Sequence, residues 1–250
     1  MSASGARIQK RPLSGQPPIN DGAAEKRPRD GAAVAGAGSG GKGTKRGATL
    51  EAALSPPLVA SARITALRAE FDRGTPFPYL RVPGVFDADL LAHARSELDS
   101  GALEWTQRNN DLFRFSQSDS LDKCAPPDSA LARVCAGLYA PSFRAWVTAV
   151  TGVGELDETL DISAARYTRG DHLLCHDDDL SGRAVAFILY LTPDAWEPAH
   201  GGALDLFASD AGGAPTRVVT RCAASFNSLT LFAVSPRSFH AVQEILSECV

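Results

Sequence analysis

Two histidines and one aspartate in the second half of the chain have the residue types and spacing of a metal site. His176 and Asp178 are separated by one residue, and His240 lies sixty-two positions beyond Asp178. Residues two apart on a β-strand point to the same face, so we expect His176 and Asp178 to converge while Asp177 points away. Two imidazoles and a carboxylate on one face of a metal are the facial triad of non-haem Fe(II) oxygenases, which leaves other coordination positions open.

Each of these three residues also has an ordinary structural interpretation. A histidine on a strand is often hydrogen-bonded within a core, and an aspartate often ends a strand. The surroundings favour the metal site, because a strand-like segment from Ile162 to Arg169 precedes the pair and an apolar strand follows it. The metal-site hypothesis therefore depends on the three residues jointly.

The remaining histidines fit such a site less well. His172 and His176 would share one side of a helix, but on a strand they lie roughly 13 Å apart, too far for one metal. We therefore expect His172 to be a pocket or surface residue. His93 and His200 have no supporting pattern around them.

The charge of the chain is unevenly distributed. Residues 1–50 hold nine Lys and Arg against three Asp and Glu, a balance of +6, so the net charge of −4 leaves −10 for residues 51–250. A domain this acidic is a poor non-specific binder of nucleic acid. It would suit a basic protein substrate, although many cytosolic enzymes are equally acidic without such a partner.

The sequence predicts a reducing compartment and no membrane insertion. Its five cysteines form no C-x-x-C pair, the N-terminus lacks the apolar core of a signal peptide, and no apolar run approaches the length of a membrane span. Residues 1–48, rich in Gly, Ala, Pro and basic residues, are predicted to be a disordered tail. Within it, Lys26–Arg29 is either a nuclear localisation signal or part of a solubilising tail. We expect a cytoplasmic or nuclear protein.

From residue 55 onward the pattern predicts helices first and strands afterwards. Apolar residues recur at helical spacing over 56–71, 87–98, 131–138 and 143–150, with extended segments at 76–82 and 112–118. From Asp161, turn residues separate seven candidate strands at 161–169, 172–178, 183–192, 203–207, 216–223, 228–234 and 238–246. The fold class expected is α+β, mainly β, with a sheet-on-sheet barrel buttressed by N-terminal helices.

Several segments together resemble a known family, the Tpa1/Ofd-type prolyl 3-hydroxylases of eukaryotes. The resemblance covers roughly residues 75 to 250. The similar segments are Asn110–Asp119, Ser163–Tyr167, His172–Asp178, Ala186–Leu191, Gly201–Leu206 and Val234–Val242.

This resemblance implies a double-stranded β-helix (jelly-roll) and a dioxygenase that uses Fe(II), 2-oxoglutarate and ascorbate. It implies that His176, Asp178 and His240 hold the iron, and that Tyr190, with Tyr167, lies near the cosubstrate. The implied substrate is a prolyl residue of a small-subunit ribosomal protein, with consequences for translation and no direct contact with nucleic acid or membrane. Either tyrosine could instead be an ordinary amphipathic barrel residue.

The sequence departs from the family after His240. The resemblance implies an arginine for the distal carboxylate of 2-oxoglutarate about twelve residues further on, but the segment from Ala241 to Val250 contains no Lys or Arg. We therefore expect the dioxygenase domain, residues 55–250, to be truncated before its last strand. Arg166 and Arg183 are the arginines that could bind the distal carboxylate in place of the expected one.

Two alternatives stay open at this point. One is an oxygenase of the same fold that hydroxylates another residue or a small molecule. The other is a catalytically inactive barrel that acts as a regulatory protein-binding module. The polar and aromatic segment from Asn109 to Asp119 is either a frame for a peptide-binding cleft or a plain edge strand.

Overall fold

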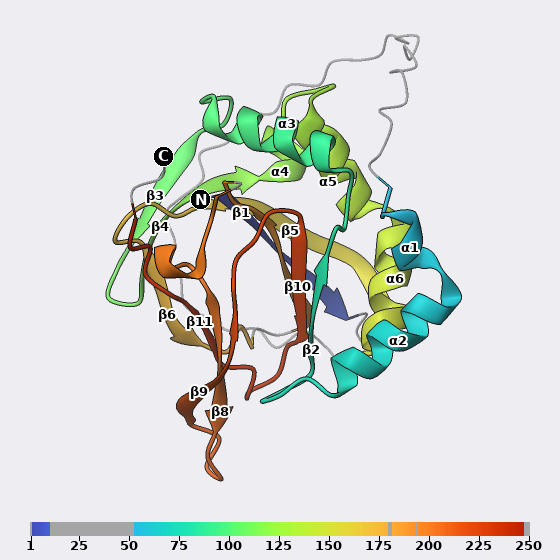
Figure 1. Ribbon diagram of the computed structural model, residues 1–250, viewed down its shortest axis with the longest axis vertical. Helices are drawn as coiled ribbons and strands as arrows, with labels where there is room; N and C mark the ends of the chain where they lie inside the picture. The colour runs from blue at the N-terminus through green and yellow to red at the C-terminus, as the bar shows by residue number, and fades with distance from the viewer. Residues whose placement is uncertain (1, 11–52, 180–181, 194, 248–250) are drawn as a thin grey trace, which may run out of the picture.

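The computed structural model describes the backbone of residues 2–10 and the complete residues 53–179, 182–193 and 195–247. Helices of the first half lie along one side and the top of a twisted antiparallel sheet in Figure 1. They are α1 (Pro56–Val59), α2 (Ser61–Asp72), α3 (Ala88–Asp99), α4 (Leu121–Cys124), α5 (Ala130–Tyr139) and α6 (Pro141–Thr151). None of them is long and apolar enough to cross a membrane.

The strands of the described residues are joined in one antiparallel sheet that curls into a barrel. Its order is β2-β10-β7-β1-β5-β4-β6-β11-β8-β9, with β3 paired to β4. The strands are β1 (Ser2–Lys10), β2 (Tyr79–Pro83), β3 (Trp105–Asn109), β4 (Phe113–Ser120), β5 (Leu156–Arg166), β6 (His172–His176), β7 (Arg183–Leu191), β8 (Leu204–Ser209), β9 (Pro215–Cys222), β10 (Ser228–Ala233) and β11 (His240–Val242). A short 3₁₀ helix, η1 (Pro198–His200), precedes β8. The predicted jelly-roll-type barrel with buttressing helices is confirmed.

Strand alternation separates the two faces of this sheet. Leu229 and Leu231 of β10, with Phe187 and Leu189 of β7, belong to the large core between the sheet and the helices. The residues between them, such as Ile188, face the barrel interior and belong to separate smaller clusters. Period-two alternation thus gives the sheet an outer face for stability and an inner face for a site.

The helices begin and end close to the predicted positions, with local differences. The Asp87 side chain accepts a hydrogen bond from the Leu90 N–H at 2.9 Å and caps α3 as expected. The single helix expected over 56–71 is instead two, α1 and α2, because Ala60 is extended between them. The predicted strand at 112–118 has a partner, β3, that the sequence pattern did not reveal.

The N-terminal segment corrects the predicted tail. Ser2–Lys10 forms β1, which pairs antiparallel with both β5 and β7. A strand in this position satisfies backbone groups that β5 and β7 would otherwise leave open, a factor that composition does not report. The tail prediction is therefore wrong for residues 2–10. Residues 11–48, with Lys26–Arg29, lie outside the described residues, as does Cys249.

The segment after β11 is fixed by a close backbone approach. Gly201 forms a bridge with Ile245, and the Leu246 N–H donates to the His200 carbonyl at 2.9 Å. Gly201 has φ +81°, and a Cβ placed on it would lie 2.0 Å from the Glu244 carbonyl oxygen. Only glycine fits there, because both the backbone conformation and the space exclude a side chain.

We predict that Gly201→Ala destabilises the protein more than Gly101→Ala. Gly101 has φ +80°, but a Cβ there would meet nothing within 4 Å, so it isolates the conformational penalty of about 1–2 kcal/mol. The steric clash at Gly201 should add about 1–3 kcal/mol. Denaturant unfolding of the two variants measures the difference. Equal losses would show that the segment after β11 shifts without cost.

Candidate metal centre

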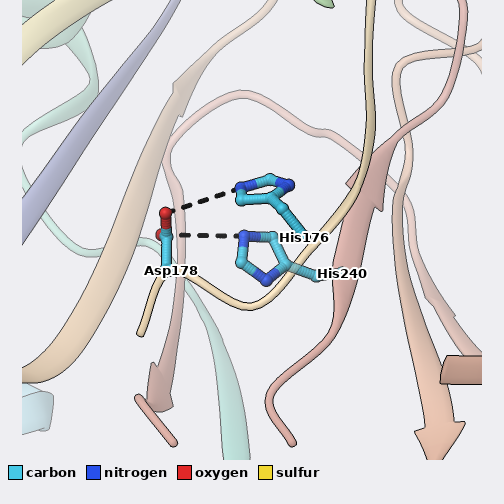
Figure 2. A group of neighbouring side chains, drawn as sticks. All are labelled: His176, Asp178 and His240. Carbon is cyan, nitrogen blue, oxygen red and sulfur yellow. Dashed lines mark ion pairs between the residues drawn. The ribbon is translucent and has the colours of Figure 1, made fainter. Parts of the chain in front are cut away.

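The two candidate histidines lie side by side because their strands pair. His176 is the last residue of β6 and His240 the first of β11, and they are direct partners in the antiparallel ladder. Their ring centroids are 4.1 Å apart with an interplanar angle of 54°. Figure 2 shows both rings facing the carboxylate of Asp178. Residues sixty-four positions apart in sequence are thus joined by sheet pairing alone.

Asp178 reaches the same point by a route different from the predicted one. The strand β6 ends at His176, so Asp178 lies in the turn beyond it rather than on a strand as expected. Its backbone is left-handed, with φ 60°, a conformation that a non-glycine residue adopts at a cost of about 1–3 kcal/mol. The turn, and not strand alternation, directs the carboxylate toward the two rings.

The three side chains present their ligand atoms to one another at short range. The His176 Nε2 atom is 3.5 Å from Asp178 Oδ1, and the His240 Nε2 atom is 3.7 Å from Asp178 Oδ2. One ligand atom from each residue lies within 4.8 Å of the other two. The side chains of His240 and Asp178 are only 5% and 8% exposed, and that of His176 is 26% exposed. The site is therefore open on the side of His176.

Hydrogen bonds at the far side of each ring fix its orientation. The Nδ1 atom of His176 lies 2.9 Å from the Leu174 carbonyl, and that of His240 lies 2.8 Å from the Ser238 carbonyl. A carbonyl only accepts, so each Nδ1 carries the hydrogen and donates it. In its neutral form each ring then has a lone pair on Nε2 that faces the Asp178 carboxylate, and such a set of acceptors can bind a shared cation.

A second layer of contacts holds the two chain segments together. The Ser238 hydroxyl is buried and donates to the Asp177 carbonyl at 2.8 Å, which ties the loop of Asp178 to the turn before His240. The Arg183 Nη1 atom lies 3.7 Å from Asp178 Oδ1. The Phe232 ring packs against the His240 ring with centroids 4.7 Å apart. Sequence reasoning missed Phe232, and it missed Ser238 although Ser238 lies in a segment that carried the resemblance.

A cavity of about 140 Å³ opens directly beside the three side chains. Both predicted tyrosines line it, and Tyr167 stacks on Phe115 with centroids 5.2 Å apart. Burial raises the pKa of the Tyr190 phenol, so the hydroxyl stays protonated and can donate a hydrogen bond. Gln117, Asp161 and Ser163 also line the cavity and were not identified from the sequence. Their alternating positions on β4 and β5 were the only signal available.

A second cavity, of about 410 Å³, adjoins the first along β4 and β6. Phe115, Gln117, Leu173 and His176 border both cavities. The rim of the second cavity carries Leu112 and Leu174, which are 57% and 47% exposed. The segment from Asn109 to Asp119 is thus half of the β3–β4 hairpin and forms a wall of this groove, beside β6.

The other titratable candidates lie elsewhere. His172 faces the Gly170 carbonyl, and His200 forms a ring contact with Trp196 and accepts from the Glu197 N–H. Neither belongs to the group of three that could hold an ion, nor does His93 of α3. Arg166 does not reach the cavity: its guanidinium lies 4.1 Å from the centroid of the Trp105 ring, and it donates to the Leu98 carbonyl.

Comparison with known proteins agrees with this geometry. Residues 162–249 match the sequence profile of the 2OG-Fe(II) oxygenase superfamily, and this match includes all three candidate ligands. That part of the chain therefore belongs to the 2OG-Fe(II) oxygenase superfamily.

The particular proteins that it resembles are prolyl hydroxylases. The chain is 43% identical over 175 residues to the mouse protein named prolyl 3-hydroxylase OGFOD1, covering 69% of this chain and 31% of the mouse protein. It is 41% identical over 184 residues to the prolyl 3,4-dihydroxylase OGFOD1 of Ostreococcus tauri, covering 69% and 36%. The chain thus spans about a third of the length of these relatives.

A solved structure shares the fold. The prolyl hydroxylase of Trichoplax adhaerens, in complex with a hypoxia inducible factor peptide fragment, superimposes with a TM-score of 0.54. The two are 14% identical in sequence, and the alignment covers 75% of this chain and 89% of that one. At this identity the likeness establishes the architecture alone.

The residues present fit the groups that the superfamily uses. Fe(II) and 2-oxoglutarate are the metal and cosubstrate of this superfamily, and two imidazoles and one carboxylate are the donor set of its iron sites. The donor atoms are close enough to share an ion about 2.1 Å from each. The adjoining cavity has the size of a small dicarboxylic acid rather than of a nucleotide or a haem.

We predict that Asp178→Ala greatly weakens Fe(II) binding and that Asp177→Ala does not. The first change removes one of three donors, whereas the Asp177 carboxylate only accepts from the Asp179 N–H. Affinity should also fall as the pH drops through the range in which imidazole protonates, because a protonated ring has no lone pair for a metal. Anaerobic titration of both variants tests this, and undiminished affinity in Asp178→Ala would refute the site.

Proposed function

We propose that this chain carries an Fe(II)- and 2-oxoglutarate-dependent dioxygenase that hydroxylates a prolyl residue of a protein. In this proposal His176, Asp178 and His240 hold the iron, and Tyr167 and Tyr190 border the cosubstrate. The single observation that carries it is the convergence of three acceptor atoms beside a small cavity. The likeness to proteins named as prolyl hydroxylases supports the substrate class.

The bound iron would supply the chemistry of dioxygen activation: one atom of O2 would enter the substrate as a hydroxyl group, and the other would enter succinate as 2-oxoglutarate loses carbon dioxide. The protein's own residues would orient the metal ligands and exclude water from the metal. The backbone carbonyls of Leu174 and Ser238 hold the two rings in position. Burial of Asp178 and His240 keeps water from one side of the ion, while the exposed side of His176 leaves an approach for substrate.

The groove along β4 and β6 suits a polypeptide better than a small metabolite. It is larger than the inner cavity, opens at the surface and shares His176 with it. Leu112 and Leu174 offer apolar contacts to a proline ring, and Arg108 offers a donor to peptide carbonyls. A proline held in this groove would present a ring carbon near the metal centre.

We further propose that the substrate is a ribosomal protein of the small subunit, so that the modification affects translation. The acidic balance of residues 51–250 favours a basic partner such as a ribosomal protein. The expected setting is the cytoplasm or the nucleus, with ascorbate as the reductant that keeps the iron in its ferrous state. Mass spectrometry of ribosomal proteins from cells lacking this protein, compared with cells expressing it or its His240→Ala variant, tests the proposal. One proline should carry an added oxygen atom in cells that express the protein, and it should lack that oxygen in cells without the protein and in cells with the His240→Ala variant.

A regulatory binding module without activity is the alternative, and one observation favours it. Among the described residues that line the inner cavity there is no Lys or Arg to pair with the distal carboxylate of 2-oxoglutarate. Succinate release that depends on 2-oxoglutarate, and that His240→Ala abolishes, would exclude this alternative.

We predict that Leu112→Asp raises the KM for a prolyl peptide about tenfold while leaving the KM for 2-oxoglutarate unchanged. A buried leucine contact contributes about 1.5–3 kcal/mol, and a carboxylate in its place would also be desolvated. Val219→Asp is the matched control, because Val219 is 40% exposed but lies on β9 and lines neither cavity. If both variants change the peptide KM equally, the groove is not the peptide site.

A further inference from the structure

The boundary between the two cavities contains one polar side chain that the metal centre does not use. Among the described residues, Phe115, Gln117, Leu173 and His176 border both cavities. Phe115 and Leu173 are apolar, and His176 is a candidate metal ligand. A proline ring that reaches the metal from the outer groove must pass this boundary. Gln117 is thus placed to contact the polar main chain of a substrate there. This inference rests on the proposed function.

Two hydrogen bonds fix the orientation of the Gln117 amide across the boundary. The Arg108 Nε–H donates to Gln117 Oε1 at 3.2 Å, and since arginine only donates, the amide oxygen must face β3. The Gln117 Nε2 atom donates to the Ser163 hydroxyl on β5 at 2.8 Å. Arg108 lines the outer groove and Ser163 the inner cavity. The oxygen therefore lies toward the groove and the nitrogen toward the inner cavity.

The amide keeps hydrogen-bonding capacity beyond these two bonds. A glutamine oxygen has two lone pairs and its nitrogen has two hydrogens, and each of the two bonds uses one of them. No other hydrogen bond of the Gln117 side chain is found among the described residues. One acceptor and one donor remain on the same planar group. This pair matches the N–H and C=O of a single residue of an extended peptide, which point to the same side of the chain.

Proline cannot be the residue that fills both positions. It has no main-chain N–H, so it would leave the spare acceptor of Gln117 without a partner. Its ring suits the apolar surfaces of Phe115 and Leu173 instead. We propose that Gln117 is a specificity-determining residue that binds the main-chain N–H and C=O of a residue adjacent to the target proline. A substrate in which that neighbour is also a proline would bind more weakly.

The test removes one main-chain N–H of the substrate at a time. The probe is a nonapeptide centred on the proline that mass spectrometry of ribosomal proteins identifies. In two further versions an ester oxygen replaces the N–H of the residue before or after that proline. Succinate release by the Fe(II)-loaded full chain gives the peptide KM. One of the two esters should raise the KM of the wild-type chain about three- to tenfold, the effect of one lost hydrogen bond.

Variants of Gln117 should change the response to that ester. In Gln117→Met, which keeps the length of the side chain without its amide, the same ester should cause no further rise in KM. Gln117→Leu repeats this comparison with a second apolar shape. Gln117→Glu should keep the ester effect, because it retains an acceptor oxygen. The other ester should have the same effect in every variant. A merely structural role of Gln117 would not produce this pattern, since lost packing weakens all three peptides alike.

Gln107→Leu is the matched control. Gln107 lies on β3 of the same hairpin, is exposed, accepts from the Ser116 hydroxyl at 3.0 Å and lines neither cavity. This variant should respond to both esters as the wild-type chain does. A wild-type chain that is insensitive to both esters, or an ester effect that persists in Gln117→Met and Gln117→Leu, would overturn the assignment. A wild-type chain that releases no succinate with the unmodified nonapeptide would refute the proposed function as well.

Discussion

The mutual approach of three hydrogen-bond acceptors is the constraint on which the site depends. Two imidazole nitrogens in their neutral form and a carboxylate, each within 4.8 Å of the others, repel one another unless a metal ion or a proton lies between them. The fold opposes that repulsion with backbone carbonyls behind each ring and with the left-handed turn at Asp178. The site is therefore preorganised, and binding a cation would relieve electrostatic strain rather than require a conformational change.

The antiparallel sheet stabilises the metal site with one face and lines the cavity with the other. Its outer face is covered by helices and provides the large apolar core, so the inner face is free to carry polar residues such as Gln117, Ser163 and Tyr190. Buried polar groups of this kind reduce stability unless they find partners. These polar groups are concentrated on the inner face, away from the main core. This arrangement is expected where the residue type at a position serves ligand binding rather than stability.

In the proposed reaction the two adjoining cavities bind different ligands, the inner one the cosubstrate and the outer one the polypeptide. The inner one is small and bordered by tyrosines, whereas the outer one is larger, apolar at its rim and open to solvent. His176 lies at their boundary and has the most exposed side chain of the three candidate ligands. In the proposed function, a polypeptide in the outer cavity would cover a cosubstrate in the inner one and exclude water from the reacting centre.

The sequence by itself predicted the strands that follow Asp161, the barrel class and the three candidate ligands, because alternation, turn residues and short motifs are local patterns, whereas β1 and β3 were missed. Strand alternation and turn residues marked β6, β7 and β10 closely, and the cap at Asp87 marked the start of α3. It also identified both tyrosines that line the cavity, through the resemblance of short segments.

Only the tertiary structure decided how those residues meet, since that depends on pairing between distant segments. The sequence pattern placed Asp178 on a strand, but the chain turns after His176 and brings the carboxylate round by a left-handed residue. It assigned residues 2–10 to a tail, but the gap between β5 and β7 holds them as a strand. Long-range backbone pairing, which composition and spacing do not encode, holds β1 between β5 and β7 and brings His176 beside His240.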